Sequence, residues 1–179
     1  MNQDIKEILI SQKALNARVR ELGQDISERY KGKELLMIGV LKGANVFMSD
    51  LMRAVTVPIQ IDFIAASSYG SSTESSGVVR IVKDLDYSIE GKHVMIVEDI
   101  IDTGLTLKYL FDNFSARKPA SLSIISLLDK PERRKVDIKV DYTGFTIQDE
   151  FIVGYGIDYA EKYRNLPYVA TLKPEVYTK

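Results

Sequence analysis

The segment from Val94 to Leu107 limits the fold of this chain more than any other part of the sequence. An apolar run ends in two adjacent carboxylates, Glu98 and Asp99, and a third, Asp102, stands directly before a Thr-Gly-Leu-Thr turn. A helical pattern of apolar residues begins after that turn. The segment therefore predicts a buried strand, a short loop and the N-terminus of a helix, in that order.

The rest of the chain also alternates between buried strands and amphipathic helices. We expect strands at 35–41, 58–66, 78–82, 93–97 and 121–128, and helices over most of 11–30, at 44–55 and at 105–114. This order favours an α/β fold, with a mainly parallel sheet flanked by helices on both faces. Short strand-like pieces at 142–147, 151–153 and 168–172 predict a small C-terminal flap, or hood. Residues 1–179 are expected to form a single domain, long enough to bury a substantial core.

Composition excludes several kinds of function. Without cysteine there can be no disulfide, thiolate metal site or cysteine nucleophile. With 24 basic and 25 acidic residues the chain has no global field for nucleic acid, so any anion must be bound locally. The one histidine, His93, opens an apolar strand, so a Ser-His nucleophile pair is not expected. No apolar run approaches the ~20 residues of a membrane span, and the N-terminus is unlike a signal peptide. We expect a cytoplasmic protein without membrane or nucleic-acid partners.

The carboxylates and the turn together predict a ligand site. In open parallel sheets, ligands bind outside the carboxyl ends of the strands. Glu98 and Asp99 fall at such an end, where two carboxylates can accept hydrogen bonds from two ribose hydroxyls or share Mg²⁺. Residues 102–106 offer backbone N–H groups, two hydroxyls and a helix dipole, which suit a phosphate. A simple helix cap at Asp102 or Thr103 is the alternative, but it leaves three neighbouring carboxylates without compensation. The segment therefore predicts a site for a ribose that carries phosphate.

Nearly the whole chain resembles the type I phosphoribosyltransferases. The segment 94–107 is similar to their phosphoribosyl-pyrophosphate motif. The matches that narrow the resemblance to the bacterial hypoxanthine (hypoxanthine-guanine) branch are Leu41-Lys42-Gly43, Ser68-Tyr69-Gly70, Lys130, Phe151-Ile152-Val153-Gly154-Tyr155 and Asp158-Tyr159. The resemblance implies purine salvage, by Mg²⁺-dependent transfer of 5-phosphoribose from 5-phosphoribosyl 1-pyrophosphate to hypoxanthine, and to guanine as well. The products would be IMP or GMP and pyrophosphate. It further implies a homo-oligomer, either a dimer or a tetramer.

The resemblance also implies roles for the residues around the phosphoribosyl group. Glu98 and Asp99 would hold the ribose hydroxyls and, together with Asp158, the Mg²⁺. The 5′-phosphate would be bound by Asp102, Thr103, Gly104, Leu105 and Thr106. In addition, Asp102 would act as general base or acid on the imidazole nitrogen of the purine. Pyrophosphate would be bound by Lys42, Gly43 and Arg164. In this family the peptide bond before the matching lysine is cis.

The purine itself would be recognised by residues in the second half of the chain. By resemblance, Lys130 would donate to the 6-oxo group, which separates 6-oxopurines from 6-aminopurines. Phe151 would stack on the ring, the backbone of Ile152 would read its edge, and the backbone of Asp158 would face the 2-position. The basic run 133–135 is interpreted as solvated surface and is given no site.

Residues 67–77 are small and polar, which is compatible with two interpretations. They could form a plain flexible connection, or a movable lid. The resemblance favours the lid, with Ser68 and Tyr69 closing over the reaction centre to exclude water.

Two other functions stay open on the sequence alone. Xanthine could be the preferred base. Alternatively, the fold could serve a ligand-sensing regulator of transcription or RNA binding, although the balanced charge supplies no basic face.

Overall fold

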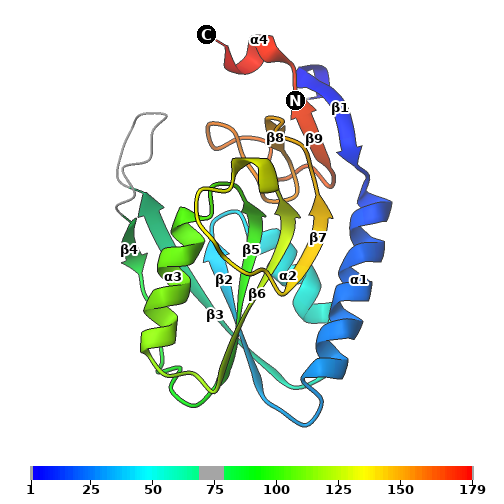
Figure 1. The fold of residues 1–179 in the computed structure, drawn as a ribbon. Helices are drawn as coiled ribbons and strands as arrows, with labels where there is room; N and C mark the ends of the chain where they lie inside the picture. Colours follow the sequence, from blue (N-terminus) through cyan, green and yellow to red (C-terminus); the bar gives the residue numbers. More distant parts are fainter. Residues whose placement is uncertain (1, 69–78, 179) are drawn as a thin grey trace.

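A six-stranded mixed sheet forms the centre of the protein in this computed structural model, which describes residues 2–68 and 79–178 (Figure 1). The strands are β2 Leu35–Leu41, β3 Ile59–Ser68, β4 Val79–Lys83, β5 His93–Ile101, β6 Ser121–Asp129 and β7 Tyr142–Thr146. Their spatial order is β4-β3-β2-β5-β6-β7. All neighbours pair in parallel except β4, which runs antiparallel to β3 at one edge. The mainly parallel sheet predicted from the sequence is confirmed.

Helices cover both faces of this sheet. They are α1 Gln12–Arg29 and α2 Asn45–Ala54 on one face and α3 Leu105–Ala116 on the other. The short α4 Pro174–Tyr177 packs instead on the second, smaller sheet described below (Figure 1). Alternate strand residues face opposite ways, so that Met37 and Met95 pack in one core with α1 and α2, whereas Ile38 and Ile96 pack in another with α3. Strands buried on both faces read as continuous apolar runs, which is why they could be located from the sequence.

A second, three-stranded sheet forms the hood, in the order β1-β9-β8. It consists of β1 Ile5–Ile10, β8 Ile152–Val153 and β9 Val169–Leu172, and it lies near the carboxyl ends of β5 and β6 (Figure 1). The sequence did not predict β1, half of whose residues are exposed and whose partner β9 lies far along the chain. The hood therefore combines the two ends of the chain.

Two expectations about the sheet need correction. Strand β5 continues to Ile101, so Glu98 and Asp99 lie within the last residues of the strand and not after it. Residues 142–146 were expected in the flap, but they form β7, which pairs in parallel with β6 at the edge of the main sheet. Hydrogen bonding to β6 extends β5 beyond its apolar residues. It also adds β7 to the edge of the main sheet.

The described part of the chain contains no helix with the length and hydrophobicity needed to cross a membrane.

Candidate active site

The predicted phosphate loop joins β5 to α3. Gly104 has a φ of +80° and stands at the N-cap position of α3, where no side chain caps the helix. The amide of Leu105 makes only a long bond, 3.4 Å, to Thr103 Oγ1. A small open pocket is lined by residues of this loop together with Glu98. Asp102 is therefore not a helix cap, and the backbone N–H groups at the start of α3 are left for a ligand.

Two neighbouring carboxylates, Glu98 and Asp99, border this loop, and their contacts do not offset the cost of burying their charges. Glu98 Oε2 is buried and has no hydrogen-bond partner among the described residues, and burial, followed by the charge of Asp99, raises the pKa of Glu98 well above its usual range. Asp99 Oδ1 accepts a hydrogen bond from the amide of Ile100 at 2.8 Å. Burial nevertheless raises the pKa of Asp99 to about 6, because backbone hydrogen bonds and Arg164 offset only part of the desolvation. A ligand with several hydroxyl groups, or a cation, would stabilise the charged form of these two carboxylates.

The loop after β2 approaches these carboxylates closely. The Leu41-Lys42 peptide bond is cis, as the resemblance implied. A Cβ on Gly43 would overlap the carboxylate of Asp99, and a Cβ on Gly156 would overlap the carbonyl oxygen of Gly43. Only glycine fits at either position, so the β2 loop and the loop after β8 meet directly beside Asp99.

Arg164 and Asp158 lie on the loop that follows this contact. Arg164 Nη2 is 2.7 Å from Asp158 Oδ1, and its Nη1 donates to the carbonyl of Gly156 at 2.8 Å. A second ion pair lies beside this one: Lys42 Nζ is 3.2 Å from Glu161 Oε2. Arg164 Nη2 is also 3.5 Å from Glu161 Oε2. The two cations predicted to bind pyrophosphate, Lys42 and Arg164, therefore both pair with the carboxylate of Glu161.

The predicted metal ligands Glu98, Asp99 and Asp158 do not form a ready-made metal site. Among the described residues, no three carboxylate, histidine or cysteine side chains are arranged to hold a metal ion. Asp158 instead pairs with Arg164. Glu98 and Asp99 still fit Mg²⁺, which commonly takes one or two protein carboxylates together with substrate phosphates, and the buried, unpaired oxygen of Glu98 is a suitable donor.

One of the predicted purine residues, Lys130, lies on the loop next to that of Asp102. Strand register places Ile101 opposite Asp129, and the amide of Lys130 donates to the carbonyl of Ile101 at 3.0 Å. Asp102 and Lys130 therefore begin neighbouring loops. The ammonium group of Lys130 is buried and donates to the carbonyl of Glu150 at 2.6 Å.

The ring of Phe151 lies at the edge of the hood and is 42% exposed. It stacks on Tyr177 of α4, with ring centroids 4.7 Å apart and planes 13° apart. Tyr159 meets it edge-on at 5.3 Å. Ile152 is buried in β8, and its backbone belongs to the hood sheet. Phe151 is thus partly exposed to a ligand while one face of its ring stacks on Tyr177, a contact that was not predicted from the sequence.

The sequence predicts solvated surface without a site for the basic run 133–135. Arg133 and Lys135 are exposed as predicted, whereas Arg134 is partly buried, and both arginines have acidic partners. Arg133 Nε is 2.6 Å from Asp102 Oδ1. Its Nη1 is 3.2 Å from Asp149 Oδ2, and Asp149 also lies 3.5 Å from Lys130 Nζ. Arg134 packs against Gly104 and pairs with Asp129. The short 3₁₀ helix Pro131–Arg133, which starts directly after Lys130, turns both arginines back towards the phosphate loop.

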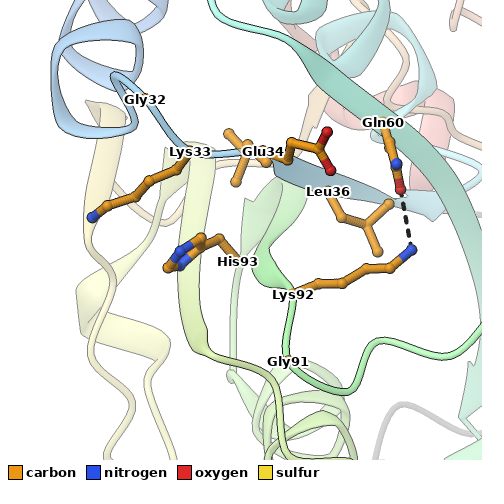
Figure 2. A pocket seen from close by; sticks show the side chains of 9 residues that line it. Gly32, Lys33, Glu34, Leu36, Gln60, Gly91, Lys92 and His93 are labelled. Atoms are coloured by element: carbon orange, nitrogen blue, oxygen red, sulfur yellow. Dashed lines mark hydrogen bonds between the residues drawn. The ribbon is translucent and has the colours of Figure 1, made fainter.

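Of the predicted lid residues, Ser68 ends β3 and Tyr69 lies outside the described residues. Figure 2 shows a different pocket, at the amino ends of β2 and β5, where Lys92 Nζ donates to Gln60 Oε1 at 3.1 Å. None of the predicted ligand residues lines it. His93 is found here, and its Nδ1 is 2.8 Å from Ser121 Oγ, at the opposite end of the sheet from Asp102. This contact ties the starts of two strands together.

Comparison with known proteins agrees with this geometry. The sequence model of the phosphoribosyl transferase domain matches residues 5–160. The chain is 53% identical over 177 residues to the hypoxanthine-guanine phosphoribosyltransferase of Bacillus subtilis, covering 99% of this chain and 98% of that protein. It is 51% identical over its full length to the bifunctional protein TilS/HprT of Listeria monocytogenes, but it spans only 28% of that protein's length. Its structure matches the crystal structure of a hypoxanthine phosphoribosyltransferase from Staphylococcus aureus, with a TM-score of 0.97 and 51% identity over 100% of this chain and 97% of that chain.

Proposed function

Because the chain belongs to the phosphoribosyl transferase family, we propose that it transfers 5-phosphoribose from 5-phosphoribosyl 1-pyrophosphate to a 6-oxopurine. Hypoxanthine is the proposed acceptor, with guanine as a second, and the products are IMP or GMP and pyrophosphate. The reaction serves purine salvage and depends on Mg²⁺. The homo-oligomer implied by the resemblance stays a prediction, which light scattering in solution would check.

The observation that carries this proposal is the placement of Asp102 beside Lys130. A 6-oxopurine presents its 6-oxo group and the imidazole nitrogen N7 side by side on one edge. An ammonium group can donate to the oxygen while a carboxylate exchanges a proton with the nitrogen. The register of Ile101 with Asp129 brings these two groups to adjacent loop starts. A 6-amino group would instead leave the buried ammonium of Lys130 facing another donor, which disfavours adenine.

The remaining residues hold the phosphoribosyl group. The start of α3 binds the 5′-phosphate through backbone N–H groups, and Glu98 and Asp99 accept hydrogen bonds from the ribose hydroxyls. Mg²⁺, when bound, supplies positive charge that offsets charge on the pyrophosphate, and Glu98 and Asp99 are the side chains that would hold it. Lys42 and Arg164 provide further cations for that leaving group. Most of the rate is expected from positioning and from stabilising separated charge.

The acid–base role of Asp102 is tested by Asp102→Asn. We expect kcat to fall by roughly 10²-fold or more, while the dissociation constant for IMP changes far less, because the amide keeps the shape of the side chain. Stopped assays of IMP formation and calorimetric titration with IMP would measure the two quantities. Asp112→Asn, on the exposed surface of α3, is the matched control. Equal losses in turnover and in IMP binding would argue against proton transfer by Asp102.

Substrate choice is tested by a steady-state assay with phosphoribosyl pyrophosphate, Mg²⁺ and a panel of bases. We expect kcat/KM for hypoxanthine and guanine to exceed that for adenine by roughly 10³-fold or more. A higher kcat/KM for xanthine would identify it as the preferred base. Ligand binding without release of pyrophosphate, for every base, would refute the enzymatic proposal and favour a regulator.

A further inference from the structure

Glu161 forms ion pairs with both cations that we assign to pyrophosphate binding. Lys42 Nζ lies 3.2 Å from each of its carboxylate oxygens, and Arg164 Nη2 lies 3.5 Å from Oε2. The side chains of Glu161 and Lys42 are about two-thirds exposed, at 67% and 68%. One acidic side chain therefore bridges the β2 loop and the loop after β8. The hydrogen bond from Lys42 is the main reason that the pKa of Glu161 is lowered.

The backbone holds Glu161 in this position. Its amide donates to Asp158 Oδ2 at 2.9 Å. Ala160 and Glu161 both have positive φ angles, +51° and +60°, a backbone conformation that residues other than glycine seldom adopt. Tyr159 and Lys162 close the turn through a pair of backbone hydrogen bonds, 3.2 and 3.0 Å long. The direction of the Glu161 side chain is thus set by a defined turn, in addition to the ion pairs themselves.

A carboxylate and a phosphate compete for the same cationic donors. We propose that Glu161 is an internal competitor of pyrophosphate, which must leave Lys42 and Arg164 when the pyrophosphate group binds and which takes them back when it departs. This inference rests on the proposed function. It assigns to Glu161 a role in limiting affinity for pyrophosphate and in speeding its release, without contact with the ribose or the purine.

The expected size of the effect follows from the exposure of these ion pairs. Exposed pairs are individually weak, and two of them together correspond to a change of roughly two- to tenfold in a dissociation constant. Glu161→Gln keeps the length of the side chain and removes its charge. It should therefore lower the dissociation constant for pyrophosphate about fivefold. The KM for phosphoribosyl pyrophosphate should fall in the same direction, and the KM for hypoxanthine should not change.

The experiment is calorimetric titration of the full chain with inorganic pyrophosphate in the presence of Mg²⁺. Wild type, Glu161→Gln and Glu161→Ala are compared with Glu90→Gln, an exposed glutamate in the turn before β5. Circular dichroism melts establish that each variant is folded. Tighter binding in both Glu161 variants, with Glu90→Gln equal to wild type, supports the proposal.

Two results would overturn it. Unchanged or weaker pyrophosphate binding in the Glu161 variants would mean that the carboxylate merely holds Lys42 and Arg164 in place. If wild type itself binds no pyrophosphate, the proposed function fails, and this inference fails with it. The two failures are distinguishable, because the first leaves wild-type binding and turnover intact.

Discussion

Replacing Asp99 by asparagine should stabilise the ligand-free protein at neutral pH. Burial raises the pKa of Asp99 from 3.8 to about 6, so the folded protein binds this proton more tightly than the unfolded chain does. The difference, 6 − 3.8, is about 2.2, which corresponds to ~3 kcal/mol at most. The favourable contribution is complete below pH ~4 and is lost as the pH rises through 6. Glu98 acts in the same direction, since burial and, after it, the charge of Asp99 raise the pKa of Glu98.

Asparagine removes the charge and retains Oδ1 as the acceptor for the amide of Ile100. Because the attraction to Arg164 is lost as well, we expect Asp99→Asn to unfold with a free energy about 1–3 kcal/mol higher than wild type at pH 8. The difference should shrink towards zero near pH 4.

Urea titrations followed by far-ultraviolet circular dichroism, in EDTA and at several pH values, would measure this difference. Asp25→Asn, exposed on α1, serves as control and should show no comparable trend with pH. A less stable Asp99→Asn at pH 8, or a difference independent of pH, would refute the assignment of Asp99 as an uncompensated buried carboxylate. Adding Mg²⁺ with pyrophosphate should stabilise wild type more than the variant.

Two further predictions concern residues whose positions were not expected. Arg133→Met removes the ion pair on one oxygen of Asp102, so kcat should fall roughly tenfold with little change in the KM for phosphoribosyl pyrophosphate. Arg133→Lys should recover part of the loss, and a kcat within twofold of wild type for the methionine variant would contradict a positioning role. Tyr177→Ala removes the ring stacked on Phe151 and should raise the KM for hypoxanthine about three- to tenfold, whereas Tyr177→Phe should not. A lower KM would mean that Tyr177 covers the face that the base needs.

The central sheet could be predicted from the sequence because its strands are buried on both sides. Runs such as 35–41 and 94–97 are apolar throughout, and helices with a clear apolar stripe separate them. The hood gave a weaker signal. Half of the β1 residues are exposed, and the strand forms because it pairs with β9, a contact that no local pattern encodes.

The candidate site divides in the same way. The carboxylates and the phosphate loop form one contiguous segment, so their chemistry could be read locally. Lys42, Lys130 and Arg164 were located through the resemblance, since an isolated lysine or arginine carries no signal of its own. The pairing of Arg133 with Asp102 and of Glu161 with Lys42 depends on loops from different strands meeting in space. Those side-chain partners could be found only in the three-dimensional structure.

The pairing of β1 with β9 has a consequence for how the protein is made. β1 pairs with β9, which lies far along the chain from it, so the hood sheet cannot close before β9 has been synthesised. The sheet that carries the phosphate loop, by contrast, consists of residues 35–146 and can form earlier. A ribosome-bound chain stalled before Val169 should therefore present an ordered phosphate loop and an incomplete purine pocket. On the proposed function, the ability to recognise a base would be acquired after the ability to hold a sugar phosphate.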